Sequence, residues 1–254
     1  MKRFWTYQNE RFPIFAHGFL IAAFSSCAVS YSALLTGGST PEWRAYLVAF
    51  ITCFLFFLQL RIADEFKDFE EDSRYRPYRP VPRGLVSLRE LGWVFAGAAA
   101  IQLALALWYF PALVIVLVIA WAYLTLMSVE FFARDWLKAR PITYLWTHMF
   151  IMPIVDFYAT ACDWLPRGEK PVLGLAFFLA ASFCNGLLIE VGRKLRQPED
   201  EEEGVPTYSK LWGVRGGSWT WWIILVVTAA LGLVSAHLIG FLLVPAIVFS
   251  LCVI

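Results

Sequence analysis

Residues 43–72 read WRAYLVAFITCFLFFLQLRIADEFKDFEED, and this stretch decides the fold. Its first part, residues 43–60, is mostly apolar with Arg44 as its one charged residue, and six carboxylates follow within residues 61–72. A helix of about 20 apolar residues crosses the roughly 30 Å hydrocarbon core of a bilayer. The stretch therefore predicts a transmembrane helix that ends in an acidic segment at the membrane surface.

Further apolar runs extend this pattern over the whole chain, at residues 14–35, 91–110, 111–127, 142–162, 171–189, 219–236 and 238–254. Charged residues make up only 16% of the sequence, against about 25% in soluble domains. A chain in lipid must satisfy its backbone hydrogen bonds internally, so each run is predicted to be helical. We predict a single domain over residues 1–254: an all-α integral membrane bundle of about eight transmembrane helices. The last run reaches Ile254 without a polar flank, so the natural domain could extend further.

Basic residues are unevenly distributed over the predicted loops. With the N-terminus placed in the cytoplasm, only three of the 21 Lys and Arg fall outside: Arg44, Arg167 and Lys170. The positive-inside rule then places the N-terminus and two long loops, roughly 61–90 and 190–217, in the cytoplasm. We expect a multi-pass protein of the bacterial inner (plasma) membrane. The net charge of +1 gives no indication of nucleic-acid binding, and the expected partner is the lipid bilayer.

The first long loop begins with carboxylates at helical spacing. Asp64, Asp68 and Asp72 follow one another at i, i+4 and i+8, which places them on one face of a helix. Like charges at this spacing destabilise a helix, so we expect a cation among them. Oxygen ligands suit Mg²⁺, which commonly joins one or two carboxylates to substrate phosphates. The alternative is a solvated acidic helix end that nearby Arg residues balance.

A segment rich in Pro and Arg follows, RPYRPVPRG at residues 76–84. Its three Pro residues forbid a continued helix. Its Arg side chains have the planar geometry that binds phosphate. The alternative is a basic loop that serves only to set the topology.

These two segments together resemble the first signature of the UbiA superfamily of intramembrane prenyltransferases. That signature reads N-D-x-x-D-x-x-x-D and then R-P-x-P-x-G-x-x-S; here residues 65–72 carry E-x-x-D-x-x-x-D and residues 79–87 read RPVPRGLVS. Asp64 stands where the family has Asn, and Glu65 where it has Asp. The segment ERFP at residues 10–13 is also similar. The resemblance covers the chain in helix order and implies a bundle, usually of nine helices, whose central apolar cavity opens to two cytoplasmic acid-rich loops.

The second long loop departs further from the family pattern. The family usually has D-x-x-x-D or N-D-x-K-x-x-x-G-D after the sixth span, whereas residues 185–194 read NGLLIEVGRK. Glu190 replaces the first acid, and Lys194 falls where a second acid or a Lys is expected. Residues 200–204, DEEEG, resemble the end of the motif. The alternative for the acidic run 199–203 is a solvated loop.

The resemblance implies three overlapping sets of site residues. The implied metal ligands are Asp64, Glu65, Asp68, Asp72, Glu190 and Asp200. The implied catalytic residues are Asp68, Asp72, Glu190 and Lys194. The implied substrate-binding residues are Arg61, Lys67, Arg79, Arg83, Asn185, Arg193, Tyr123 and Arg134.

The function that the resemblance implies is Mg²⁺-dependent transfer of a prenyl group from a prenyl diphosphate to an aromatic or lipophilic acceptor in the membrane. Benzoate-using members carry a Tyr near the end of the fourth span and then a Lys-Arg pair, but no such pair follows Tyr123. A terpene cyclase of the same fold, which needs no acceptor, is therefore an alternative. A transporter is the alternative from another class, although acids at the interface rather than at mid-bilayer argue against it.

Two ionisable residues, His148 and Asp156, lie inside the apolar run 142–162. Ionisable residues within a membrane span are functional hypotheses by default. For His148 a hydrogen bond between helices is an equally good interpretation.

Overall fold

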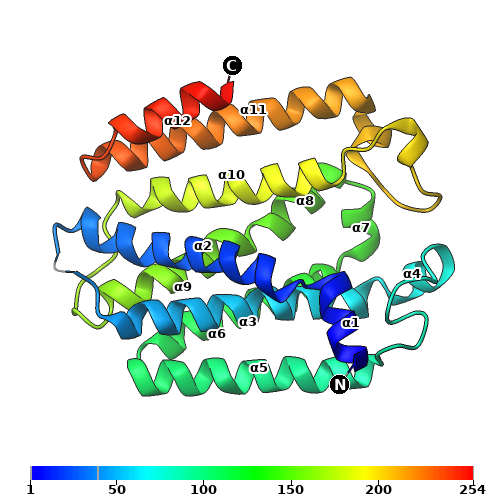
Figure 1. The fold of residues 1–254 in the computed structure, drawn as a ribbon, viewed down its shortest axis with the longest axis horizontal. Helices are drawn as coiled ribbons and strands as arrows, with labels where there is room; N and C mark the ends of the chain where they lie inside the picture. The colour runs from blue at the N-terminus through cyan, green and yellow to red at the C-terminus, as the bar shows by residue number, and fades with distance from the viewer. Residues whose placement is uncertain (1, 39, 254) are drawn as a thin grey trace.

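Helices joined by short loops make up the protein, and the all-α prediction is confirmed. The computed structural model describes residues 2–38 and 40–253, and no strand occurs among them. The short helix α1 (Lys2–Arg11) lies across one end of a bundle of long helices (Figure 1). The bundle consists of α2 (Ile14–Leu35), α3 (Trp43–Lys67), α5 (Leu88–Tyr109), α6 (Leu113–Ser128), α8 (Pro141–Met149), α9 (Ile151–Trp164), α10 (Leu175–Arg193), α11 (Tyr208–Leu238) and α12 (Leu243–Val253).

Five of these helices, α2, α3, α5, α10 and α11, are long and apolar enough to cross a membrane. The helix α6 is apolar but shorter. The turn at Pro111 between α5 and α6 is as short as the sequence predicts. The last predicted run, 238–254, becomes the end of α11 and α12, and its final residue lies outside the described residues.

The run predicted at residues 142–162 is divided into α8 and α9, with Phe150 between them. Pro153 explains the division. Its ring clashes with the carbonyl four residues earlier, at Met149, and its nitrogen has no hydrogen to donate. The chain therefore breaks its helix at Met149 and starts a new one at Ile151.

The core lies where α3 crosses α2 and α9. Small residues at the contact, such as Ala49 and Cys53, are fully buried and let the helices approach closely. Polar side chains join helices as well: Gln102 of α5 donates to the Thr52 carbonyl at 3.1 Å and accepts from the Trp121 indole at 2.9 Å. These bonds fix α5 and α6 against α3.

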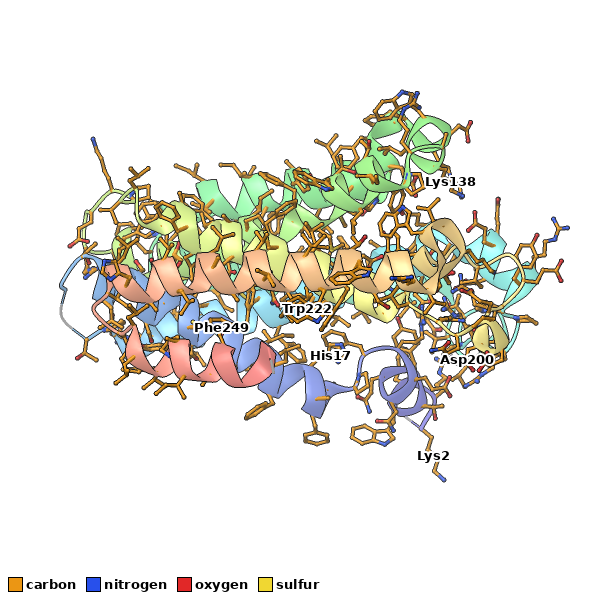
Figure 2. The ribbon with its side chains drawn as sticks, turned by 90° about the horizontal axis from the view of Figure 1, so that it is seen from above. Lys2, His17, Lys138, Asp200, Trp222 and Phe249 are labelled. Carbon is orange, nitrogen blue, oxygen red and sulfur yellow. The ribbon has the colours of Figure 1, made fainter. Side chains whose placement is uncertain are left out.

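The segments between helices that hold most of the basic residues gather at one end of the bundle. This end carries α1, α4 (Phe69–Tyr75), α7 (Arg134–Lys138) and the loop before α11 (Figure 1). In Figure 2, Lys2, Lys138 and Asp200 all lie at this end. The positive-inside rule predicts that these basic segments lie on one side of the membrane, which requires such an arrangement. That this side is the cytoplasmic one stays a prediction.

A cavity of about 1000 Å³ lies between α1, α3 and α5. It is therefore at the side of the bundle, next to the N-terminal helix, rather than at its centre. The central cavity that the family resemblance implies stays a prediction.

The orientation is tested by thiol labelling in a background without native Cys. Ser73 is exposed on α4 and Lys170 is exposed at the opposite end of the bundle. In intact cells, Cys at position 73 should resist a membrane-impermeant maleimide, whereas Lys170→Cys should react. Labelling of Ser73→Cys from outside would reverse the predicted topology.

Candidate functional site

The first acidic motif lies where α3 gives way to α4. The helix α3 ends at Lys67, and Asp68 separates it from α4 with φ −95° and ψ 4°. Helix-type hydrogen bonds nevertheless continue, from the Asp68 amide to the Asp64 carbonyl at 2.9 Å and from the Asp72 amide to the Asp68 carbonyl at 2.8 Å. The helical spacing of these three residues is thus kept across the junction.

Cations hold two of these three carboxylates. Asp64 lies 3.5 Å from Arg61 Nη1 and 3.6 Å from Lys67 Nζ. Asp72 is almost completely buried and forms ion pairs with Arg76 and Arg79, the latter at 2.6 Å. Arg79 belongs to the Pro-rich segment, so Asp72 anchors that segment to α4.

Asp68 differs from its neighbours because, among the described residues, its side chain has no ion-pair or hydrogen-bond partner. Burial raises the pKa of Asp68, Lys67 opposes this, and the negative charges of Asp64 and Asp72 add to it. An incoming cation would remove this repulsion. Asp68 is therefore the carboxylate of the motif that gains most from a bound metal ion.

Glu65 is placed differently from the other implied ligands. It is 2% exposed and forms an ion pair with Arg11 at the end of α1. Consecutive residues on a helix point about 100° apart, so Glu65 cannot share a face with Asp64. The pair instead attaches α1 to α3.

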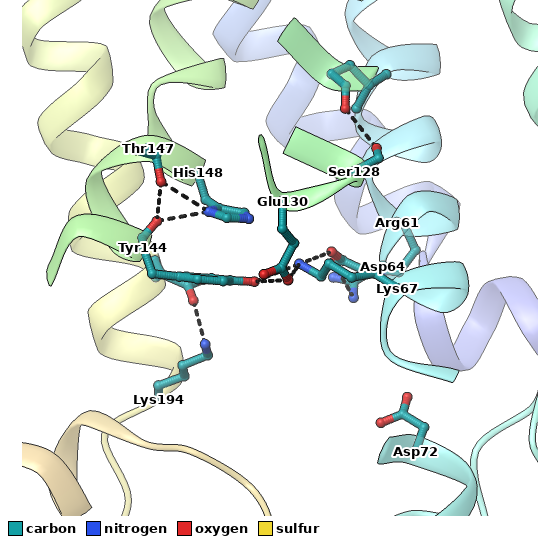
Figure 3. Close-up of polar contacts among 12 residues, drawn as sticks. Arg61, Asp64, Lys67, Asp72, Ser128, Glu130, Tyr144, Thr147, His148 and Lys194 are labelled. Carbon is teal, nitrogen blue, oxygen red and sulfur yellow. Dashed lines mark hydrogen bonds and ion pairs between the residues drawn. The ribbon is translucent and has the colours of Figure 1, made fainter. Parts of the chain in front are cut away.

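A second group of polar residues, missed in the sequence, meets Lys67. The Lys67 ammonium donates to the Tyr144 hydroxyl at 2.8 Å, and this hydroxyl donates to Glu130 Oε1 at 3.3 Å. Glu130 Oε1 also lies 4.0 Å from Lys67 Nζ, and Glu130 is only 3% exposed (Figure 3). The signal in the sequence was a single acid, Glu130, between the apolar residues Val129 and Phe131. An ionisable group in such surroundings indicates a functional role.

The backbone that carries Glu130 is strained. Glu130, Phe131 and Phe132 have φ values of 51°, 53° and 57°, a left-handed conformation that non-glycine residues rarely adopt. Each such residue costs on the order of 1 kcal/mol or more. The surrounding packing must impose this conformation, for example through the edge-to-face contact of Phe131 with Tyr123. Strain of this kind concentrates at functional sites.

His148 supports this group rather than joining helices. Its ring stacks on Tyr144 with centroids 3.8 Å apart, and its Nδ1 lies 2.9 Å from the Tyr144 carbonyl in the same helix. The interhelical hydrogen bond considered from the sequence is not formed at this atom. Asp156 is buried in α9, away from the acidic loops.

In the second motif, cations hold Glu190. This residue is 6% exposed at the end of α10, with Arg193 on one oxygen and Lys194 Nζ 2.9 Å from the other. Figure 3 shows Lys194 and Asp72 on the two sides of the view, with Tyr144, Glu130 and Lys67 between them. The two motifs thus face a common region from α10 and α4. Asn185 is half-buried on α10, earlier in the same helix.

Four other implied residues have partners outside this region. Arg83 pairs with Glu10 at 2.8 Å, and Arg134 lies 3.9 Å from Glu71. The Tyr123 hydroxyl donates to the Thr147 carbonyl at 2.6 Å, which connects α6 to α8. The side chain of Asp200 is exposed; its carbonyl accepts from Arg196 at 3.2 Å, and its amide donates to the Gln197 carbonyl at 3.0 Å.

The two long loops contact each other although they are more than 100 residues apart in sequence. The Tyr78 hydroxyl donates to Glu202 at 2.9 Å, and Arg196 holds the same carboxylate at 2.7 Å. Gly204 packs on the Tyr75 ring so closely that a Cβ would lie 2.5 Å from it, and its φ of 69° also favours glycine. The acidic run 199–203 is therefore fastened to the first loop rather than freely solvated along its whole length.

The carboxylates suit a metal ion that arrives with a phosphate. Within the described part of the chain, no three His, Cys, Asp or Glu side chains are placed to hold a metal ion by themselves. Mg²⁺ typically takes only one or two protein carboxylates and completes its shell with phosphate oxygens and water. Asp68 and its neighbour Asp64 fit that requirement in number and in donor type.

The Arg11–Glu65 pair gives a stability prediction. Arg11→Met would leave Glu65 buried and unpaired, which should lower the free energy of unfolding in detergent by about 3 kcal/mol. Arg3→Met is the matched control, because Arg3 pairs with Glu90 at the surface and is half-exposed; its loss should cost at most ~1 kcal/mol. Unfolding by denaturant measures both, and equal losses would contradict a structural role for the buried pair.

Comparison with known proteins identifies the family and the fold. The family model of the UbiA prenyltransferase family matches residues 22–254. No curated protein matches the chain. A similar solved structure is the apo form of a UbiA homolog from Aeropyrum pernix K1, with a TM-score of 0.72 at 14% identity over 93% of this chain and 84% of that one.

Another similar structure comes from a structural and mechanistic study of digeranylgeranylglyceryl phosphate synthase in membranes. Its TM-score is 0.60 at 17% identity, over 98% of this chain and 88% of that one. At such identities the two structures show a shared fold alone. The family match extends over more than half of the sequence, and with it the chain is shown to belong to the UbiA prenyltransferase family.

Proposed function

We propose that this protein is a Mg²⁺-dependent prenyltransferase that moves a prenyl group from a prenyl diphosphate to an aromatic or lipophilic acceptor within the membrane. The observation that carries the proposal is the unpaired, part-buried Asp68 between two cation-bound carboxylates at the end of a membrane helix. Such a carboxylate favours a divalent cation, and the surrounding Lys and Arg favour the phosphates that accompany it.

The chain's own residues would act mainly by holding charge in place. The C1–O bond of the prenyl diphosphate breaks, the electron pair leaves with the diphosphate, and the allylic carbon bonds to the acceptor, which gives up a proton. Lys67, Arg79 and Lys194 would stabilise the negative charge that develops on the departing oxygen, because they are already fixed near the motifs. Mg²⁺, when bound, supplies further neutralisation of that charge.

Glu190 is proposed to become a metal carboxylate only when the diphosphate is present. In the structure its two oxygens are occupied by Arg193 and Lys194. Phosphate oxygens are a good alternative partner for both cations. Their transfer to the phosphate would free Glu190 for Mg²⁺.

A terpene cyclase is the second candidate, and one contact favours it. The Tyr123 hydroxyl is used to join α6 to α8, and the Lys-Arg pair of the benzoate-using members is absent. Purified protein with farnesyl or geranylgeranyl diphosphate and Mg²⁺, but without acceptor, separates the two. A hydrocarbon product would support the cyclase; a requirement for an added membrane extract would support the transferase.

Removal of the first motif's carboxylates should abolish the reaction. Asp68→Asn and Asp72→Asn are each expected to slow diphosphate release by about a hundredfold or more, since a metal site supplies several kcal/mol. Glu70→Gln is the control, because Glu70 is exposed on the same short helix. Phosphate detection measures all three. Near-normal rates in both Asn variants would reject this motif as the metal site.

The role of Glu190 is tested by binding. Glu190→Gln should weaken the binding of a non-hydrolysable diphosphate analogue and shift its Mg²⁺ dependence to higher concentration. If Glu190 served only to pair with Arg193 and Lys194, its replacement would change the stability of the protein but leave the Mg²⁺ dependence of binding unchanged. Titration calorimetry at several Mg²⁺ concentrations gives both quantities. Curves that coincide with those of the wild type would assign Glu190 a structural role.

A further inference from the structure

The Lys67 ammonium is surrounded by oxygen atoms from three parts of the chain. It donates to the Tyr144 hydroxyl of α8 at 2.8 Å, and it lies 3.6 Å from Asp64 Oδ1 and 4.0 Å from Glu130 Oε1 (Figure 3). The Asp68 carboxylate is within electrostatic range as well. Several oxygen atoms around one cation are what Mg²⁺ and Ca²⁺ receive in proteins. The ammonium therefore occupies a position that would otherwise suit a metal ion.

Glu130 depends on this ammonium. It is only 3% exposed, and within residues 2–38 and 40–253 Lys67 is its one ion-pair partner. Its second oxygen, Oε2, is buried and has no hydrogen-bond partner in the same part of the chain. A buried carboxylate without a cation is strongly destabilising. The Glu130 charge thus holds the ammonium in place, and the Tyr144 hydroxyl connects the two groups.

The ammonium keeps hydrogen-bond donors for a ligand. An ammonium has three N–H donors, and among the described residues only the Tyr144 hydroxyl accepts one at hydrogen-bond distance. Asp64 and Glu130 attract the charge but are too far away for good hydrogen bonds. The Lys67 side chain is 13% exposed, so it is not closed off from solvent. Two donors therefore remain for phosphate oxygens beside Asp68.

The charges around Lys67 favour one metal ion rather than two. Three carboxylates, those of Asp64, Asp68 and Glu130, lie around the Lys67 ammonium, and the Arg61 guanidinium is 3.5 Å from Asp64. Three negative and two positive charges leave one net negative charge. One Mg²⁺ reverses its sign, whereas a second would crowd two divalent ions against an ammonium that is already in place. Like charges this close repel strongly when they are partly buried.

We propose that the Lys67 ammonium, held by Glu130 and Tyr144, acts as a fixed cation in place of a second metal ion, so that the first motif takes a single Mg²⁺ with the diphosphate. Glu130 and Tyr144 are then positioning residues, because they act through Lys67. This inference rests on the proposed function and specifies how that site holds the diphosphate.

The test counts metal ions in the purified protein. Mn²⁺ replaces Mg²⁺, the unreactive farnesyl S-thiolodiphosphate replaces the substrate, and electron paramagnetic resonance of free Mn²⁺ gives the ions taken up with the analogue. The count is made in a Glu190→Gln background, so that only the first motif contributes. That protein should take up one ion. Adding Lys67→Met should raise the count to two, because Asp64 and Glu130 are then free to bind the second ion.

Two ions with Lys67 present would overturn the proposal, and so would a single ion in a folded protein with Lys67→Met. Either result would leave the proposed function standing, because the analogue would still bind with a metal ion. If the wild type takes up no Mn²⁺ with the analogue, the proposed function fails together with this inference. The outcomes therefore separate the two claims.

The positioning role has its own test with Lys67 in place. Glu130→Gln should weaken analogue binding at saturating Mn²⁺ by about tenfold, the loss expected when one charged hydrogen bond is misplaced. Asp163→Asn is the matched control, since Asp163 is 4% exposed and pairs with Arg167 at 2.6 Å at the opposite end of the bundle. Both variants should lose stability, but only Glu130→Gln should lose affinity. Unchanged affinity in Glu130→Gln would overturn the positioning role.

A milder pair of variants covers the case in which Glu130→Gln does not fold. Tyr144→Phe removes the hydroxyl that joins Lys67 to Glu130 and should also weaken analogue binding. Tyr109→Phe removes a hydroxyl that donates to the Cys162 carbonyl at 3.0 Å, far from the motifs, and should leave binding unchanged. Equal affinity of the two variants would contradict the proposal.

Discussion

Every feature of the acidic end depends on one constraint: a carboxylate that leaves water needs a cation. Removing an ionised group from water is costly unless it is paired, and the remaining partner of a broken pair is strongly destabilising. Glu65, Asp72 and Glu190 are nearly buried, and each has at least one Arg or Lys within ion-pair distance. These pairs fix the positions of α1, of the Pro-rich segment and of the end of α10. Asp68 is only part-buried and, among the described residues, has no such partner; the proposed metal site is centred on it.

Much of the fold follows from the sequence because the bilayer allows few solutions. Apolar runs of sufficient length must be helices. The distribution of basic residues over the loops predicts which ends of these helices lie on the same side of the membrane. The division between α8 and α9 could also have been predicted, since Pro153 disrupts the helix at Met149 wherever it occurs. The cavity between α1, α3 and α5 could not be predicted, because it depends on how α1 lies across α3 and α5, and no local pattern encodes that crossing.

The candidate site was only partly predictable, because the sequence encodes local spacing but not contacts between distant segments. The spacing of Asp64, Asp68 and Asp72 is local, and the backbone keeps it. Contacts between distant segments left weaker signals. Tyr144 of α8 and Glu130, which follows α6, meet Lys67 at the end of α3 although they are more than 60 residues away in sequence. Family likeness implies that Glu65 is a metal ligand, which stays a prediction; in the structure its carboxylate pairs with Arg11 of α1.

The ion pairs also order the region in which we propose that the diphosphate binds. Contacts between the two long loops, such as Tyr78 with Glu202, fix their relative position before any ligand is present. Lys138 pairs with Glu71 and holds α7 against α4; its hydrogen bond lowers the pKa of Glu71 and keeps it ionised. When a phosphate enters such a region, the Lys and Arg side chains would exchange a carboxylate partner for a phosphate oxygen. Because the Lys and Arg side chains are already ordered, they would lose little conformational entropy on binding the proposed diphosphate. Charges fixed in this way would stabilise the negative charge that develops on the diphosphate in the transition state more than they stabilise the ground state.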